Sequence, residues 1–208
     1  MAQKDDKMLF GIARSRIAIS RVFGFIIILL LLFTGHSFKQ GALADIFFEL
    51  SGLFLLTICS FGRLWALMYI SGYKSDSIIT DGPYSIVRHP LYFFSSVGAL
   101  GIGLASENVL VLVLIVIFYL LYYPLTILAE EKKLTQKFGP VYVDYMKRTP
   151  RFFPKLSLYR EPEMYYVKTA SFVWNFADGM WFIWIFLLMH LIETLQNAGV
   201  LHVVVTIP

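Results

Sequence analysis

Two groups of charged residues have a spacing that could support chemistry, and the first surrounds His89. Arg88 and His89 follow a turn signal at residues 81–84 and precede Pro90. Proline suits the first position of a helix, whose free N–H groups and positive dipole end attract an anion. These residues predict a cationic pocket for a carboxylate or phosphate. The alternative is that Arg88 only anchors the chain at a membrane surface and His89 only caps the helix.

The second group is the acidic pair Glu130 and Glu131, which follows an apolar run. Carboxylates close to the carboxyl end of a helix, in a basic region, run against the usual charge preferences. They indicate a site for the hydroxyl or ammonium groups of a polar ligand. The alternative is simple pairing with Lys132, with Lys133 or with a neighbouring loop.

Other polar residues in apolar surroundings give weaker signals. Asn175 and Asp178 share one helix face, as do His190 and Glu193. An ionisable residue inside a membrane is a functional hypothesis by default, although we expect Asp178 to lie at the membrane interface. The sequence has no metal-ligand spacing and no nucleophile elbow.

The elements that must position these residues are membrane helices. The chain has 208 residues, of which 58% are hydrophobic and only 15% charged, whereas a soluble domain has about 25% charged residues. This composition predicts a single all-α domain over residues 1–208, built as a transmembrane bundle of about five spans. The expected spans are 17–34, 46–70, 91–104, 109–129 and a last one that runs either from 169 to 195 or from about 179.

Basic residues set the expected orientation of these spans. Sixteen of the 18 Lys and Arg residues fall before or in the first turns of the first span, between the second and third, or after the fourth, which places the N-terminus and the charged groups on the cytoplasmic side. The membrane would be the inner membrane in a bacterium or the endoplasmic reticulum in a eukaryote. The formal charge of +4 does not indicate a nucleic-acid partner, because the basic residues flank apolar runs. We expect Arg63, inside the second span, to reach towards the basic side.

The third span is shorter than a membrane requires. Fourteen residues extend about 21 Å, against a hydrocarbon core of about 30 Å, so its start at His89 should lie near the depth of the lipid headgroups. Small residues Ser95, Ala99 and Gly103 repeat along it and predict close helix packing. After the fourth span a polar helix should continue to the stop signal at residues 139–140. An amphipathic element with Val141, Tyr142, Tyr145 and Met146 on its apolar face should then lie on the membrane.

These motifs together resemble the isoprenylcysteine carboxyl methyltransferase and phospholipid methyltransferase family. The resemblance rests on GPYSIVRHPLY at residues 82–92 and EEKKLTQKFGPVYVDYMKRTPRFFP at residues 130–154, and it covers about 50–155. It departs from the family pattern at Phe94, where many relatives have glycine. The segment after Lys155, including a membrane segment at about 165–208, has no counterpart in the minimal pattern.

The resemblance implies a membrane methyltransferase that uses S-adenosylmethionine and acts on a lipid or lipid-linked acceptor in the bilayer, through a carboxylate, phosphate or amine. The cofactor would lie between membrane helices and the cytoplasmic segment. Its implied cofactor-binding residues are Tyr84, Arg88, His89, Tyr92, Glu130, Glu131 and Tyr142. Its implied catalytic residues are Arg88, Glu131 and Arg151. Two other possibilities remain at this point: an NADPH-dependent reductase of the related sterol-reductase group, and a non-enzymatic accessory protein with the same fold.

The expected orientation gives a first test. A cysteine introduced by Gln40→Cys lies in the predicted loop at 38–43, opposite the cytoplasmic side, and one introduced by Lys137→Cys lies on the cytoplasmic side. An impermeant thiol reagent should label the two variants from opposite faces of the membrane. Labelling of both from one face would contradict the orientation.

Overall fold

The chain folds as an all-helical bundle in a computed structural model that describes residues 2–36, 42–71 and 77–207. For residues 2–14, 16, 17, 36 and 205–207 it describes the backbone alone. The long helices are α1 (Ala2–Phe33), α2 (Leu43–Ile70), α4 (Pro90–Ala105), α5 (Val109–Phe138) and α7 (Thr169–Asn197). Shorter elements are the helices α3 (Pro83–Ile86), α6 (Pro140–Arg148) and η1 (Leu156–Leu158), and the strands β1 (Thr34–His36) and β2 (Val205–Ile207), which pair in parallel.

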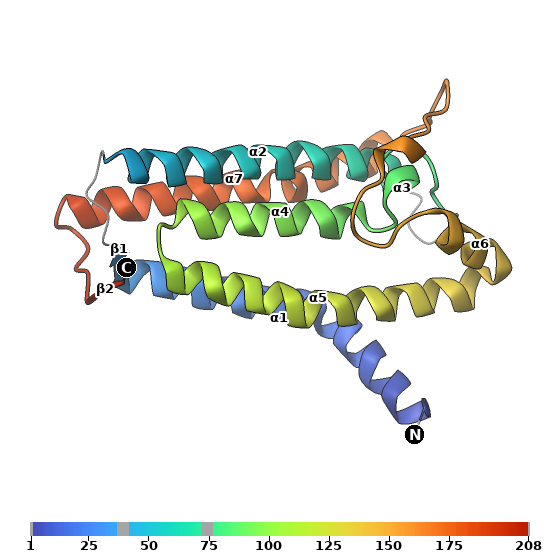
Figure 1. Ribbon diagram of the computed structural model, residues 1–208, viewed down its shortest axis with the longest axis horizontal. Coiled ribbons are helices and arrows are strands. Elements are labelled where there is room, and N and C mark those ends of the chain that lie inside the picture. The colour runs from blue at the N-terminus through green and yellow to red at the C-terminus, as the bar shows by residue number, and fades with distance from the viewer. Residues whose placement is uncertain (1, 37–41, 72–76, 208) are drawn as a thin grey trace.

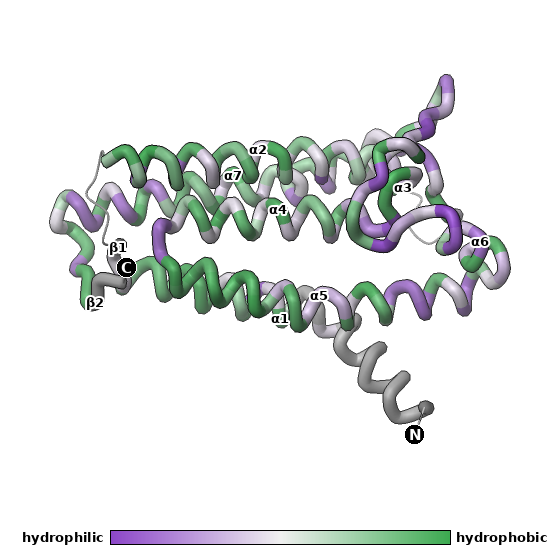
Figure 2. The backbone as a smooth tube through the Cα atoms, viewed as in Figure 1, coloured by the Kyte–Doolittle hydropathy of each residue, from purple (hydrophilic) through white to green (hydrophobic). Residues whose placement is uncertain are grey.

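The long helices form two layers (Figure 1). Helices α2, α4 and α7 pack against one another, α1 packs along α5, and α4 joins the layers through its contact with α5. Hydrophobic residues line the middle of the bundle, whereas hydrophilic residues gather around α6 and the polar end of α5 (Figure 2). A core between the layers contains Ile27, Leu31, Leu56, Cys59, Ala99, Ile102, Val111, Ile115, Phe182 and Met189.

The described helices confirm an all-α membrane bundle. Three of them, α2, α5 and α7, are long and apolar enough to cross a membrane, and Ala18–Phe33 and Pro90–Ala105 are shorter apolar helices. Helix α7 is continuous from Thr169, so the first of the two expected arrangements of the last apolar region is correct. The predicted loop at 38–43 lies mostly outside the described residues, as do Lys39 and Lys74.

Helix α4 has 16 residues and is therefore short, as expected: it extends about 24 Å. Helix α5 has 30 residues and continues without a break into its polar end, where Gly139 terminates it with a φ of 56°. A length of about 45 Å exceeds the hydrocarbon thickness. Glu130 and Glu131 therefore lie on a rigid extension of a spanning helix.

Helix α6 differs from expectation in what it contacts. Tyr142 and Tyr145 are buried against protein, whereas Val141 is 67% exposed, so the two tyrosines do not share a membrane-facing surface with Val141 as expected. The Tyr145 hydroxyl donates a hydrogen bond to the backbone oxygen of Tyr84 at 2.7 Å. The aromatic face of α6 therefore packs against protein. The Tyr145 hydroxyl satisfies a buried backbone oxygen there, as buried acceptors normally require.

Glycines allow α2 and α4 to approach closely. A Cβ atom added to Gly52 would lie 2.7 Å from the backbone oxygen of Gly101 and 2.6 Å from the Cβ of Ala105. A Cβ added to Gly62 would meet the Phe94 ring, so the departure from the family pattern at position 94 fills the space beside this glycine. The α4 residues in these contacts are Gly101, Ala105 and Phe94, whereas Gly103 of the predicted stripe faces Leu112 of α5.

The Gly52 contact can be tested by matched substitutions. Gly52→Ala forces backbone atoms of two helices apart and should cost about 1–3 kcal/mol, the usual range for overpacking. Gly24→Ala is the control, since no atom lies within 4 Å of a Cβ added there, and alanine favours the helix. Thermal unfolding in detergent should show a lower Tm for the first variant alone. Equal Tm values would contradict the close approach.

Candidate functional site

The candidate site is organised around the carboxylate of Glu131, whose side chain is only 7% exposed. Its Oε1 lies 2.9 Å from Nη1 of Arg88 and 3.3 Å from Nε2 of His89. Arg151 approaches with two nitrogens, Nη2 at 2.9 Å from Oε2 and Nε at 3.2 Å from Oε1. One buried carboxylate therefore receives two guanidinium groups and an imidazole.

These partners come from separate parts of the chain. Arg88 and His89 lie between α3 and α4, where His89 is the residue before the first turn of α4 and Pro90 begins the helix. Arg151 follows α6. The sequence brings Arg88 and His89 together by adjacency, but only the fold brings them to Glu131, 42 residues after His89.

Backbone hydrogen bonds hold these two parts together. The N–H of Arg88 donates to the oxygen of Pro150 at 2.9 Å, that of Lys155 to Ile86 at 3.0 Å, and that of Gly82 to Arg160 at 2.8 Å. Residues 150–160 thus run antiparallel to residues 82–88. This pairing fixes the position of Arg151 relative to Arg88. At the end of the paired segments away from Arg88, Arg160 forms an ion pair with Asp81 at 3.1 Å.

Glu130 takes a different position from Glu131. Its Oε2 accepts a hydrogen bond from the Tyr92 hydroxyl at 2.7 Å. The Tyr92 ring lies edge-on to Tyr123 at 5.4 Å, and Tyr123 donates to the Tyr119 hydroxyl at 3.1 Å. A row of three tyrosines, each in contact with the next, thus extends from Glu130 into the bundle.

Two tyrosines from α3 and α6 form the wall behind the cluster. Tyr84 and Tyr142 are both buried, with 7% and 2% of their surface exposed. Burial raises the pKa of the Tyr142 phenol, and the nearby negative charge of Glu131 raises it further. Burial also raises the pKa of the Tyr84 phenol well above its ordinary value, and Glu130 adds to this. Both side chains are therefore neutral hydrogen-bonding groups at physiological pH.

The structure thus brings the sequence-predicted residues to one end of the bundle. Arg88, His89, Glu131 and Arg151 are in direct contact, and Tyr92 contacts Glu130. Sequence reasoning did not predict that Glu131 itself occupies the cationic pocket, and it gave no role to the Tyr145 hydroxyl bond. The spacing of Tyr142 and Tyr145, which places them on one helix face, is the signal that could have indicated a packed tyrosine pair, but this face was assigned to the membrane surface.

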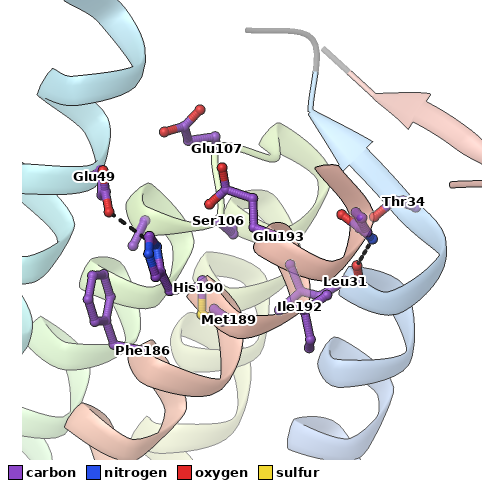
Figure 3. A pocket seen from close by; sticks show the side chains of 12 residues that line it. Leu31, Thr34, Glu49, Ser106, Glu107, Phe186, Met189, His190, Ile192 and Glu193 are labelled. Carbon is purple, nitrogen blue, oxygen red and sulfur yellow. Dashed lines mark hydrogen bonds and ion pairs between the residues drawn. The ribbon is translucent and has the colours of Figure 1, made fainter. Parts of the chain in front are cut away.

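The other ionisable residues singled out in the sequence lie elsewhere. His190 Nδ1 is 3.5 Å from Oε1 of Glu49, and both line a pocket with Glu193 and Glu107 at the opposite end of the bundle (Figure 3). Among the residues that the structure describes, no three His, Cys, Asp or Glu side chains are arranged to hold a metal ion. Asp178 pairs with Arg63 at 2.5 Å. The guanidinium of Arg63 thus contacts Asp178 of α7 and Ser95 of α4, and its reach towards the basic side stays a prediction.

The Glu131 cluster predicts a stability effect. Glu131→Gln leaves Arg88, whose side chain is 9% exposed, without its charged partner. Removing one member of a buried pair costs about 3–5 kcal/mol, so we expect a clear fall in Tm. The sequence alone would predict no such loss, because it places Glu131 at the membrane surface and outside any packed core.

The control for this prediction is Asp144→Asn, which removes an exposed ion pair with Lys147. Exposed pairs contribute little to stability, so its Tm should equal that of the unchanged chain. Thermal unfolding of both variants in one detergent provides the measurement. Similar Tm values for Glu131→Gln and the unchanged chain would contradict a structural role for the cluster.

Comparisons with known proteins relate the chain to methyltransferases. The family profile described as phospholipid methyltransferase matches residues 40–141. Protein-S-isoprenylcysteine O-methyltransferase of Schizosaccharomyces pombe is 32% identical over 81 residues, which cover 39% of this chain and 34% of that protein. No solved structure matches the chain significantly.

Two bacterial relatives match nearly the whole chain. The cobalt-zinc-cadmium resistance protein CzcN of Cupriavidus metallidurans is 37% identical over 196 residues, which cover 94% of this chain and 90% of that protein. The nickel-cobalt-cadmium resistance protein NccN of Alcaligenes xylosoxydans xylosoxydans is 37% identical over 197 residues, covering 95% and 92%. The segment after Lys155 is therefore shared with these relatives. With its paired motifs, its helical bundle and these matches, the chain belongs to the membrane methyltransferase family that includes phospholipid and isoprenylcysteine methyltransferases.

Proposed function

We propose that this protein is an S-adenosylmethionine-dependent methyltransferase that methylates a lipid or lipid-linked acceptor at the end of the bundle containing Glu131. The observation that carries the proposal is a pair of buried donor atoms that have no partner at this end. Nε of Arg88 and the hydroxyl of Tyr84 are both buried and form no hydrogen bond with the residues that the structure describes. Buried polar groups are normally satisfied, so these atoms indicate the position of a polar ligand.

The charges of the cluster fit the cofactor. Two guanidinium groups, Arg88 and Arg151, face the single carboxylate of Glu131, which leaves an excess positive charge for the carboxylate of the methionine moiety. Glu130, with its partner Tyr92, supplies the opposite charge for an ammonium group or for ribose hydroxyls. Tyr84 and Tyr142 supply flat apolar surface for the adenine.

Each residue then has a defined role. Arg88 and His89 bind the cofactor carboxylate, and Arg151, whose side chain is 51% exposed, orients an anionic acceptor. Glu131 already accepts from three side chains, so it acts as a positioning residue that holds Arg88 and Arg151 in place. We infer that Glu130, rather than Glu131, contacts the ribose or ammonium group.

When bound, S-adenosylmethionine supplies a methyl group on a positively charged sulfur. The protein contributes alignment of the acceptor with that carbon and exclusion of water, which are large terms in such reactions. A carboxylate or phosphate acceptor attacks without losing a proton, whereas an amine acceptor must first be deprotonated. The short helix α4 and the ring pair Phe93–Phe152, with centroids 5.9 Å apart, favour an amphiphile whose chains remain in the bilayer.

A second candidate function comes from the names of the two bacterial relatives, which describe resistance to cobalt, zinc, cadmium and nickel. A non-enzymatic accessory protein of a metal-resistance system would share the fold without binding the cofactor. The two functions differ in one observable. Only the methyltransferase binds S-adenosylhomocysteine, the product of the reaction.

A matched pair of tyrosine variants tests the proposed site. Tyr84→Phe removes a hydroxyl that has no partner in the structure, so it should not lower Tm. If the hydroxyl binds the cofactor, the affinity for S-adenosylhomocysteine should fall about two- to tenfold, the value of one neutral hydrogen bond. Tyr145→Phe removes a hydroxyl already bonded to the Tyr84 backbone, so it should lower Tm with little change in affinity.

Calorimetric titration and thermal unfolding of the two variants give both quantities. Equal affinities for Tyr84→Phe and the unchanged chain would exclude the Tyr84 hydroxyl from the site. An unchanged chain that does not bind S-adenosylhomocysteine would favour the accessory function.

A further inference from the structure

A second buried cation lies deeper in the bundle than the Glu131 cluster. Arg63 is seven residues before the end of α2, a distance of about 10 Å along the helix axis. Its side chain is only 12% exposed. A charged side chain at such a depth is costly and usually functional.

The neighbours of Arg63 hold its guanidinium in one orientation. Nη2 lies 2.5 Å from Oδ2 of Asp178 on α7, and Nη1 donates to the Ser95 hydroxyl on α4. The guanidinium carbon is 5.5 Å from the centre of the Phe182 ring. Asp178 is 64% exposed, so it approaches Arg63 from the outer surface of the bundle.

The Nε atom of Arg63 is buried and has no hydrogen-bond partner among the residues that the structure describes. The same holds for the hydroxyl of Ser60. Ser60 is 1% exposed and lies one helical turn before Arg63 on the same face of α2. Two unsatisfied polar groups on one face, beside a fixed cation, indicate that an oxygen-rich anion completes this site.

This position is adjacent to the proposed methyl-transfer site. Ser95, the partner of Arg63, follows Tyr92 by three residues on α4, so the two side chains lie on one face and about 5 Å apart along the axis. Tyr92 in turn donates to Glu130. A ligand that contacts Arg63 therefore reaches the cofactor residues within one helical turn.

We propose that Arg63, with Ser60 and Ser95, binds the anionic group of an amphiphilic methyl acceptor, a carboxylate or a phosphate. This inference rests on the proposed methyltransferase function. Arg63 is then a specificity-determining residue that selects acceptors with an anion at this depth. Asp178 competes with the acceptor for the guanidinium and neutralises it when no acceptor is bound.

The competition makes the proposal testable by two substitutions with opposite effects. Arg63→Gln removes the cation and should weaken binding of an anionic amphiphile at least tenfold, the value of a charge-assisted hydrogen bond. Asp178→Asn removes the competing carboxylate and should strengthen binding about threefold or more. A purely structural ion pair predicts weaker or unchanged binding for both variants, because neither would create a better site.

The probes are oleate for a carboxylate and dodecyl phosphate for a phosphate, each added to the purified full chain in a neutral maltoside detergent. Native mass spectrometry measures the fraction of chain with bound probe.

Arg160→Gln is the matched control, since it breaks an arginine–carboxylate pair with Asp81 on an exposed surface. Ser60→Ala tests the unsatisfied hydroxyl and should weaken binding about threefold. S-adenosylhomocysteine affinity is measured for every variant.

The proposal is supported if either probe binds the unchanged chain and the Arg160→Gln variant, binds Arg63→Gln weakly, and binds Asp178→Asn more tightly. It is overturned if neither probe binds, if Arg63→Gln binds as well as the unchanged chain, or if Asp178→Asn binds no more tightly. Should Arg63→Gln fail to fold, Asp178→Asn and Ser60→Ala decide by the same criteria. If the unchanged chain does not bind S-adenosylhomocysteine, this result counts against the methyltransferase function. Binding of oleate or dodecyl phosphate tests the role of Arg63 independently of that result.

Discussion

Burial of the Glu131 carboxylate is the interaction on which the polar end of the protein depends. An ion removed from water costs several kcal/mol unless nearby groups compensate for the lost hydration. Here the compensation comes from Arg88, His89 and Arg151, which belong to two chain segments that meet only in the folded state. The antiparallel pairing of residues 150–160 with residues 82–88 brings these donors to one carboxylate, and Tyr142 and Tyr145 of α6 are buried at the same end of the bundle.

The Glu131 cluster and the Arg63–Asp178 pair lie at different depths of the bundle. Glu131 organises a positively charged pocket at the polar end of α5, while Arg63 lies about one turn further into the bundle than Tyr92. Helix α4 connects the two levels, because it carries Tyr92 and Ser95 on one face. Its glycine-mediated contact with α2 fixes this face relative to Arg63. Close packing in the apolar core thus sets the geometry of the polar groups.

The sequence predicted the elements better than it predicted their partners. Spans, the shortness of α4 and the stop at Gly139 follow from apolar length and local turn chemistry, which depend on neighbouring residues. The contact between His89 and Glu131 joins residues 42 positions apart, and no local rule contains such pairings. The motif resemblance selected residues that the structure brings together at this end, but it could not show that Glu131 fills the cationic pocket. Arg63 and Asp178 were visible as opposite charges in apolar helices, although their pairing required the fold.

The distance in sequence between Arg63 and Asp178 has a consequence for synthesis of the protein. The two residues are 115 positions apart, and α7 is the last long helix of the described chain. At about 5–20 residues per second, a ribosome makes Asp178 roughly 6–23 seconds after Arg63. During this interval α2 carries a cation whose carboxylate partner does not yet exist. Until α7 is made, water or a lipid phosphate must therefore neutralise the charge of Arg63. The ion pair between α2 and α7 can form only after α7 has been synthesised.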